Sequence, residues 1–336
     1  MDILEAEAKR CFNGLVNRYG FSLRVQTGTY VHTEGSSTVS LPYLKPTAML
    51  QKLLQSYPWA LFGGHSEQQA PELLRTFWKT YQKEHPQHEV FGRGVDLSRV
   101  IPLTVHGDGG RTAKKQPLEV FSLQPLLGLE SASMARRECR CEASSVEYGH
   151  GALSDPSLQC LNSKFNTYCT HFLIFAYPSK EYKDLTSNLL QGFIEHVCRD
   201  LNSACRDGLI STTGHRYFFA MLGFRLDMEW MKKVGSLSRS YMNVGTKRKI
   251  PCCHECEAGT AGVPFEDVNR DAEWVNTRFR TKPWNTPPPW RHLPFDRARP
   301  AGFLKRDPFH VFRLGILRNW LASSVFLLIF MGRSFV

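Results

Sequence analysis

Two aspartates in this sequence each stand at the end of an apolar segment of strand length. Asp108 lies in the motif G-D-G-G, which is predicted to be a turn after the segment 97–105, and Asp227 directly follows the segment 216–226. Two carboxylates that share a dry site repel each other unless a divalent cation neutralises them. Magnesium or manganese held by such a pair can activate water or a 3′-hydroxyl for attack on a phosphodiester. The alternative is that Asp108 is a hairpin residue and Asp227 only ends a strand.

A second candidate site is the cysteine motif P-C-C-H-E-C. Cys253 and Cys256 have the C-x-x-C spacing of a zinc knuckle, and thiolates are soft ligands that zinc holds tetrahedrally. One such pair is half a site, which Asp307 and His310, spaced D-x-x-H on one helical face, can complete. Alternatively, Asp307 caps a helix and His310 is an ordinary, partly buried histidine. A redox role for the two cysteines is a weaker alternative, because no thioredoxin-like unit surrounds them.

Basic residues close to both motifs are candidate contacts to nucleic-acid phosphates. The alternatives are that 247–249 is a nuclear localisation signal or that these residues belong to solvated loops. The candidates are Arg111, Lys114, Lys115, Lys247, Arg248 and Lys249.

Four aromatic side chains are further candidates. His106 and His215 flank the proposed aspartate site, where they can touch a substrate. Trp284 and Trp290 stand in a Pro-rich stretch, where they can stack on bases or fix an irregular segment to the core.

The elements that position the aspartates follow from apolar periodicity. Within the core, one helix is predicted, over 184–205, because apolar residues recur there every four positions. The order is strand, strand, strand, helix, strand. A ribonuclease-H-like sheet has this order, and in it the first and fourth strands are parallel neighbours, so Asp108 and Asp227 are expected at one edge. The four predicted strands are 97–105, 118–123, 171–177 and 216–226.

The predicted fold is α/β (α+β), with a ribonuclease-H-like mixed sheet in the order β-β-β-α-β. Residues 1–95 are predicted to form a helical N-terminal module. Residues 96–245 form the core, with an insertion at about 128–168. Residues 246–336 contain the zinc-knuckle-like insertion, a Pro- and Trp-rich segment and a C-terminal helix.

Composition restricts the class of protein. The 336 residues correspond to about two domains of roughly 150 residues each. Hydrophobic residues make up 42% and charged residues 22%, which excludes an overall disordered chain. The formal net charge of +11 attracts polyanions such as nucleic acid, without setting sequence specificity.

The cysteine content, the N-terminus and the longest apolar run indicate in which cellular compartment the protein is expected. The 10 cysteines are too few for a disulfide scaffold, and the N-terminus has acidic residues where a secretory signal has basic ones. We therefore expect a protein of the nucleus or cytoplasm that is not secreted. The apolar run 320–331 is shorter than the ~20 residues that span a bilayer. It predicts a buried helix, with a membrane or oligomer contact as a weaker alternative.

Four motifs in order resemble the transposases of the CACTA and Kyakuja-Dileera-Zisupton groups, cut-and-paste enzymes with a ribonuclease-H-like core. The motifs are G-D-G-G, L-D, P-C-C-H-E-C and D-P-F-H-V-F-R-L-G-I, and the similarity spans roughly 97–322. The resemblance implies that Asp108 and Asp227 are the first two catalytic aspartates and bind Mg²⁺ or Mn²⁺. It also implies that Cys253 and Cys256 form the knuckle, with structural Zn²⁺, and that Asp307 and His310 form the D-x-x-H signature.

The sequence departs from the family in its third acidic ligand. That residue follows the D-x-x-H region, and no Asp or Glu occurs in 308–336, which leaves Glu229 and Glu255 as local substitutes. We therefore expect a truncated, transposase-derived DNA-binding protein that ancestrally catalysed metal-dependent DNA cleavage and strand transfer and is catalytically incomplete here. The alternative is a non-catalytic, zinc-containing module that binds nucleic acid or protein. DNA is the expected partner, self-association is left open, and no small-molecule substrate or membrane span is expected.

Overall fold

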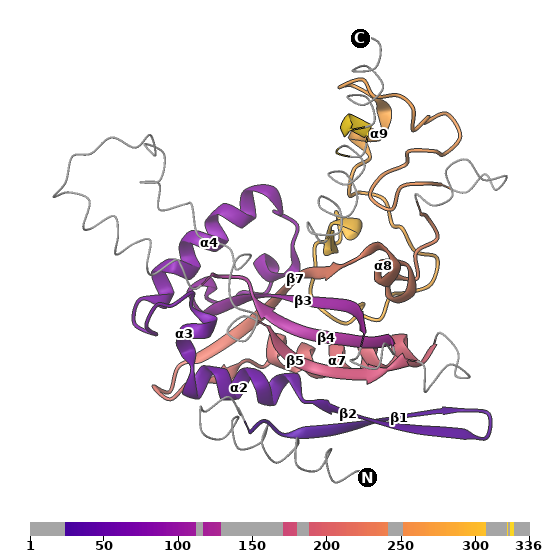
Figure 1. Cartoon of the computed structure of the whole chain (residues 1–336). Helices are drawn as coiled ribbons and strands as arrows, with labels where there is room; N and C mark the ends of the chain where they lie inside the picture. Colours follow the sequence, from indigo (N-terminus) through magenta and orange to yellow (C-terminus); the bar gives the residue numbers. More distant parts are fainter. Residues whose placement is uncertain are drawn as a thin grey trace, which may run out of the picture.

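Apolar segments from distant parts of the chain pair into one mixed sheet, which forms the centre of the computed structural model (Figure 1). The structure describes residues 24–111, 117–128, 171–179, 188–240, 251–306, 321 and 323–325. The sheet is 6-stranded, in the order β5-β4-β3-β7-β6, and β8 pairs with β7. Its strands are β3 (Val100–Arg111), β4 (Pro117–Pro125), β5 (Phe172–Pro178), β6 (Leu209–Ile210), β7 (Arg216–Leu226) and β8 (Leu304–Arg306).

The central sheet contains both antiparallel and parallel strand pairs. Strand β4 is antiparallel to β3 and β5, whereas β3 and β7 are parallel. Parallel neighbours need a crossover connection, and α7 (Asn188–Arg206) lies in the connection from β5 to β7. The prediction that the first and fourth strands are parallel neighbours is thus confirmed.

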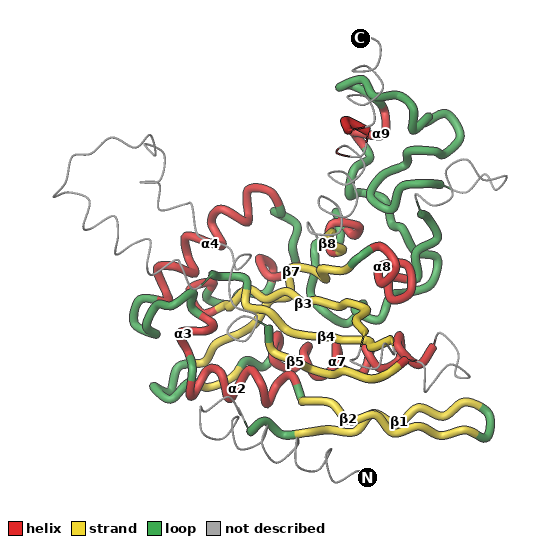
Figure 2. Tube along the Cα trace, in the orientation of Figure 1, coloured by secondary structure: helices red, strands yellow, loops and turns green. Residues whose placement is uncertain are grey.

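Helix α7 and the shorter α8 (Met228–Gly235) pack on the same face of the sheet (Figure 2). Phe193 of α7 stacks on Phe175 of β5 with ring centroids 4.2 Å apart, and Phe175 stacks on Phe121 of β4 at 5.1 Å. Trp230 of α8 stacks on the same Phe121 at 6.3 Å. Aromatic pairs of this kind add to the burial energy of their rings. A column of aromatic rings therefore joins both helices to the sheet.

Strand β3 extends further than the sequence indicates. The G-D-G-G motif is paired with β4 as far as Arg111↔Pro117 and is not the turn that we predicted. A Cβ at Gly107 would lie 2.5 Å from ring atoms of Trp230, so this glycine allows a helix to pack closely on the strand. The predicted strand also begins too early, because Leu97–Arg99 form a 3-10 helix.

A β-hairpin that the sequence did not predict precedes the N-terminal helices in the chain and packs against α7. It consists of β1 (Thr27–Glu34) and β2 (Ser37–Leu44), which pair antiparallel. Tyr30 stacks on Phe193 of α7 at 5.0 Å, and the Tyr43 hydroxyl is 2.8 Å from Nε2 of His196. The hairpin thus packs on the outer side of α7.

Three helices follow the hairpin, within the region 1–95 that was predicted to be a helical N-terminal module. Each has a proline at its first or second position, where the missing amide proton costs nothing. Trp78 anchors the longest of them to the sheet, because its indole N–H donates to the carbonyl of Val100 at 2.8 Å. The helices are α2 (Pro46–Ser56), α3 (Pro58–Leu61) and α4 (Ala70–Glu84).

Residues 251–306 form a mostly irregular lobe beside the carboxyl end of β7 (Figure 1). Its only regular elements are α9 (Glu273–Asn276), the 3-10 helix η5 (Pro300–Phe303) and β8. Almost all of the predicted insertion at 128–168 and most of the predicted C-terminal helix lie outside the described residues. No helix in the described part of the chain is long and apolar enough to cross a membrane.

Candidate functional site

The carboxyl ends of β3 and β7 lie side by side. Gly107 of β3 and Leu226 of β7 are register partners, and Asp108 and Asp227 are the residues that follow them. Strand spacing is about 4.8 Å, so the backbones of the two aspartates are close together although they are far apart in the sequence. The sequence-based expectation that both stand at one edge of the sheet agrees with this register.

Asp227 also has a structural role. It is the N-cap of α8, and its Oδ1 accepts a hydrogen bond from the backbone N–H of Trp230 at 2.7 Å. Caps of this kind satisfy an amide that has no partner within the helix. The alternative interpretation of Asp227 as the residue that ends a strand therefore agrees with the structure. Asp227 also begins the next helix, as its N-cap.

Asp108 emerges on the other face of the sheet. Gly107 and Gly109 both face Trp230 of α8, and side chains alternate along a strand. Asp108 therefore shares its face with His106 and with the β4 residues paired to these two, which include Ser122.

That face carries a polar cluster, which consists of His106, Ser122, Gln124, His171 and Arg225. Arg225 donates to Oε1 of Gln124 at 3.0 Å, and the rings of His106 and His171 meet edge to face at 5.4 Å. Burial, together with the neighbouring charges of His106 and Arg225, lowers the pKa of His171 to about 4. His171 is therefore a neutral imidazole at physiological pH.

His106 thus lies beside Asp108, as expected, but His215 does not. His215 precedes the first residue of β7, whereas Asp227 follows its last residue. The prediction that both histidines flank the aspartates is therefore wrong for His215.

Two other acids, Glu229 at the start of α8 and Glu119 opposite Gly109, form ion pairs with one lysine. Nζ of Lys233 lies 2.8 Å from Oε1 of Glu229 and 3.8 Å from Oε1 of Glu119. Burial alone would lower the pKa of Lys233, but the hydrogen bond to Glu229 and the charges of Glu119 and Asp227 raise it above its ordinary value. The ammonium group of Lys233 therefore neutralises two carboxylates that could otherwise bind a metal ion.

Glu119 is the acid that sequence reasoning missed. It is buried on β4, opposite Gly109 and on the face that α8 covers, and its Oε2 has no hydrogen-bond partner among the described residues. Among the residues that the structure describes, no group of three or more His, Cys, Asp or Glu side chains is arranged to hold a metal ion. This includes Glu229 and Glu255, the substitutes that the sequence suggested for a third acidic ligand.

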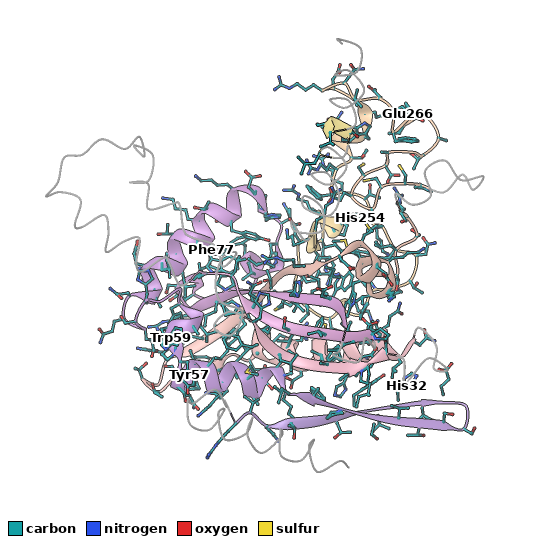
Figure 3. The ribbon with its side chains drawn as sticks, in the orientation of Figure 1. His32, Tyr57, Trp59, Phe77, His254 and Glu266 are labelled. Atoms are coloured by element: carbon teal, nitrogen blue, oxygen red, sulfur yellow. The ribbon has the colours of Figure 1, made fainter. Side chains whose placement is uncertain are left out.

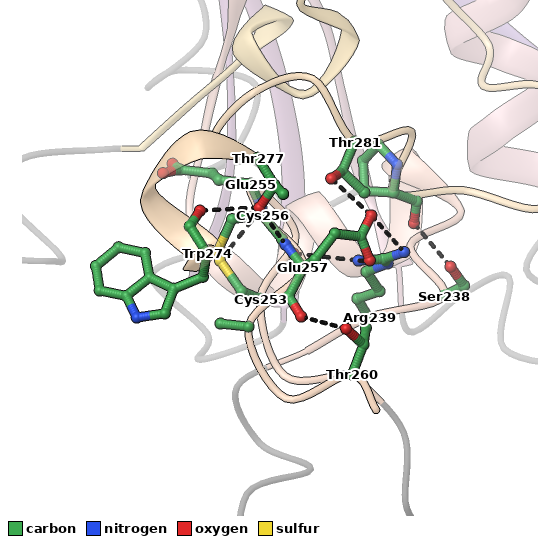
Figure 4. A network of polar contacts seen from close by, with 12 residues as sticks. Ser238, Arg239, Cys253, Glu255, Cys256, Glu257, Thr260, Trp274, Thr277 and Thr281 are labelled. Atoms are coloured by element: carbon green, nitrogen blue, oxygen red, sulfur yellow. Dashed lines mark hydrogen bonds and ion pairs between the residues drawn. The ribbon is translucent and has the colours of Figure 1, made fainter. Parts of the chain in front are cut away.

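Cys253 and Cys256 lie together at the base of the lobe (Figure 4). Burial and the hydrogen bond that its own thiol donates to Cys253 raise the pKa of Cys256 to about 12, so this thiol is protonated without a metal. Cys252 turns elsewhere, because its thiol donates to the carbonyl of Ala258 at 3.3 Å. The contact between Cys253 and Cys256 is what the C-x-x-C spacing predicted. Asp307 and His310, the expected partners, lie outside the described residues.

Ion pairs and hydrogen bonds hold the segment after Cys256 in place. Arg239 donates to Oε2 of Glu257 at 2.8 Å, and Thr281 donates to its Oε1 at 2.8 Å (Figure 4). The hydrogen bond from Arg239 lowers the pKa of Glu257. His254, labelled in Figure 3, is buried where the lobe meets the sheet, and burial lowers its pKa. The segment that directly follows the cysteine pair is therefore held by polar contacts to Arg239 and Thr281.

The two tryptophans of the Pro-rich stretch belong to the core. Trp290 is fully buried and lies 5.0 Å from the ring of Phe224 on β7, and the ring of Trp284 meets it edge-on at 5.8 Å. Neither ring is available to a base. The expectation that they fix an irregular segment is confirmed, and the stacking alternative is wrong.

The basic candidates are not placed by the structure. Residues 114–115 and 247–249 lie outside the described part of the chain. Arg111 ends β3, but its side chain is not among those described. Comparison with protein-family models, with curated proteins and with solved structures finds no match to this chain.

Proposed function

We propose that this chain is a transposase-derived DNA-binding protein with a ribonuclease-H-like core and an incomplete catalytic site. The observation that supports this most strongly is the register of β3 and β7, in which Asp108 and Asp227 follow the partners Gly107 and Leu226. Ligands of open α/β sheets gather outside the carboxyl ends of parallel strands. Two acidic residues at that edge are where metal-dependent phosphodiester chemistry needs them.

The strand order supports the same proposal. An antiparallel series β5-β4-β3 is joined through α7 to β7, which is parallel to β3. This order of three antiparallel strands, a crossover helix and a parallel fourth strand is that of ribonuclease-H-like cores. The net charge of +11 favours DNA as partner and the nucleus as location.

The chemistry around Lys233 supports an incomplete catalytic site. Metal-dependent phosphoryl transfer depends on carboxylates that position a cation and on the stabilisation of charge at the reacting phosphate. Here Glu119 and Glu229 are paired with an ammonium, and Asp227 gives one oxygen to a helix cap. If Asp108 and Asp227 bind Mg²⁺ or Mn²⁺, the metal would supply Lewis-acid chemistry at the strand ends, and these two side chains would hold it.

The test is manganese-dependent nicking of supercoiled DNA by the purified chain, beside its Asp108→Asn and Asp227→Asn variants. Asparagine caps a helix as well as aspartate does, so Asp227→Asn removes charge without loss of the cap. We expect bound but uncut DNA from all three proteins. Cutting by the unchanged chain that both variants lose would contradict the incomplete site.

A second candidate function, a zinc-containing binding module, is favoured by the thiol contact between Cys253 and Cys256. Zinc bound there would replace the thiol protons and tie the lobe together. We expect zinc content to fall in Cys253→Ser and Cys256→Ser and to stay unchanged in Cys252→Ser, because the thiol of Cys252 points to Ala258. Equal zinc content in all four proteins would exclude a site at this pair.

A further inference from the structure

A cleft of about 310 Å³ opens along β8, where the lobe meets the central sheet. Its volume lies at the lower end of the range of about 300–1,000 Å³ that small-ligand sites have. Three cations line it, Arg299, Lys305 and Arg306, together with the carboxylate of Glu255 and the ring of Phe279. Of these residues only Glu255 entered the sequence-based predictions, as a substitute acidic ligand.

The charges in the cleft do not balance. Oε1 of Glu255 is 2.8 Å from Nε of Arg306, and its other oxygen is 3.7 Å from Nε of Arg278 outside the cleft. Glu255 is thus already used by two arginines. Within the described ranges, neither Arg299 nor Lys305 forms an ion pair with a carboxylate, so the cleft keeps a positive excess.

These cations are held in fixed positions. Arg299 donates to the carbonyl of Glu84 at 2.6 Å, and its guanidinium lies 5.2 Å from the centroid of the Phe279 ring. The side chain of Lys305 packs over Gly223 of β7, where a Cβ would lie 2.8 Å from its Cγ. Groups fixed in advance lose little conformational freedom when a ligand binds. The arrangement is that of a site and not of a mobile basic surface.

Burial makes Lys305 receptive to an anion. Desolvation, together with the charge of Arg299, lowers its pKa. An ammonium that has lost its water gains more from a bound anion than an exposed one, because the local dielectric constant is lower. Arginine in turn binds phosphate oxygens through two parallel N–H groups.

The cleft lies beside the ends of the strands that carry the aspartates. In the pairing of β7 with β8, Arg225 is opposite Lys305 and Leu226 is opposite Arg306. Leu226 is also the partner of Gly107, so one row crosses the sheet from Gly107 through Leu226 to Arg306. The β8 backbone that carries Lys305 and Arg306 therefore lies about one strand spacing, ~4.8 Å, from the β7 backbone that leads to Asp227.

We propose that the cleft lined by Arg299, Lys305 and Arg306 binds a phosphate group of the DNA backbone and that Glu255 competes with this phosphate for Arg306. The choice of DNA as the source of the phosphate rests on the proposed function, whereas the cleft itself does not. Glu255 then limits affinity, since the phosphate has to displace it from Arg306.

The experiment measures binding of a labelled duplex of random sequence to the full chain at several salt concentrations. For Lys305→Gln we expect affinity to fall at least about tenfold, as for loss of a charged hydrogen bond. The slope of log K against log salt should decrease by about 1. For Glu255→Gln we expect tighter binding, an effect that a misfolded variant would not show.

The exposed ion pair of Arg75 and Glu72 on α4 provides matched controls. Arg75→Gln removes one positive charge, as Lys305→Gln does, and Glu72→Gln removes one negative charge, as Glu255→Gln does. Both should bind DNA like the unchanged chain. A parallel titration with a nucleoside triphosphate tests whether the source is a free phosphate.

Unchanged affinity and slope in Lys305→Gln would overturn the cleft proposal alone. Nucleotide binding that depends on Lys305, beside DNA binding that does not, would overturn DNA as the ligand. Absence of DNA binding by the unchanged chain would instead refute the proposed function. Because no arm of this experiment needs cleavage, a negative nicking assay does not affect its outcome.

Discussion

Gly107 of β3 and Leu226 of β7 are partners in a parallel pairing, and the residue after each is an aspartate. The partnership has a steric basis, because Gly107 lacks the Cβ that would collide with both Trp230 and Leu226. The glycine thus lets α8 begin directly after β7 and pack against β3. The same contact fixes the backbone that carries Asp108 and Asp227.

Substitution of Gly107 tests this steric basis. We expect Gly107→Ala to lower the free energy of unfolding by about 1–3 kcal/mol, as overpacking does in well-packed sites. Urea denaturation measures the change. Gly92→Ala is the control, since a Cβ there meets nothing within 4 Å, and it should stay within about 0.5 kcal/mol of the unchanged chain. Equal stability of both variants would show that Trp230 does not pack on Gly107.

Substitution of Asp227 separates its cap from its charge. Asp227→Ala should cost about 0.5–2 kcal/mol of unfolding free energy, because the N–H of Trp230 loses its acceptor. Asp227→Asn should cost much less, since its side-chain oxygen can accept the same bond. Thermal or urea unfolding distinguishes the two. If both variants lost the same stability, the charge of Asp227 and not the cap would be what stabilises the fold.

The partly buried His171 of the polar cluster predicts a pH dependence. The pKa of His171 is about 4 in the folded protein against 6.5 for an ordinary histidine. As pH falls below about 6.5, the unfolded chain takes up a proton at this residue that the folded chain excludes. The stability that neutral His171 provides is therefore complete above pH 6.5 and is lost progressively down to about pH 4.

The measurement compares unfolding free energies at pH 7.5 and 5 for the unchanged chain and for His171→Gln. We expect a smaller loss on acidification in the variant. His215→Gln, which changes an exposed histidine, should behave like the unchanged chain. An equal pH dependence in all three would show that His171 titrates normally.

Trp290 should hold the irregular lobe to the sheet. Truncation of this fully buried ring in Trp290→Ala should cost about 3–5 kcal/mol and expose residues 251–306 to limited proteolysis. Trp59→Ala is the control, because that ring is 42% exposed. Resistance of the Trp290 variant to proteolysis would mean that other contacts anchor the lobe.

The sequence predicted the elements whose periodicity is strong. The apolar stripe of α7 and the continuous apolar segments of β5 and β7 are as expected within a few residues. The register of β3 and β7 followed from the order of the elements and not from any single residue. Local composition failed for G-D-G-G, because glycines that admit Trp230 look the same in sequence as glycines that form a turn.

Tertiary contacts explain the other differences. In β4, Leu118 and Val120 are on one face and Phe121 and Leu123 on the other, so alternation alone does not show that Glu119 faces inward. The cleft at β8 joins His85, which follows α4, to residues of the lobe 251–306 that are far apart in the sequence. Such sites are visible only once the chain is folded.

The most direct test of the central claim is DNA binding by the full chain across a range of salt. Phosphate contacts release counterions, so a protein that makes several of them loses affinity by roughly 10³–10⁵ between 50 and 200 mM salt. We expect binding to a random duplex that weakens steeply in this range and is unchanged by Asp108→Asn. No binding at 50 mM salt, or binding that salt does not weaken, would contradict the account.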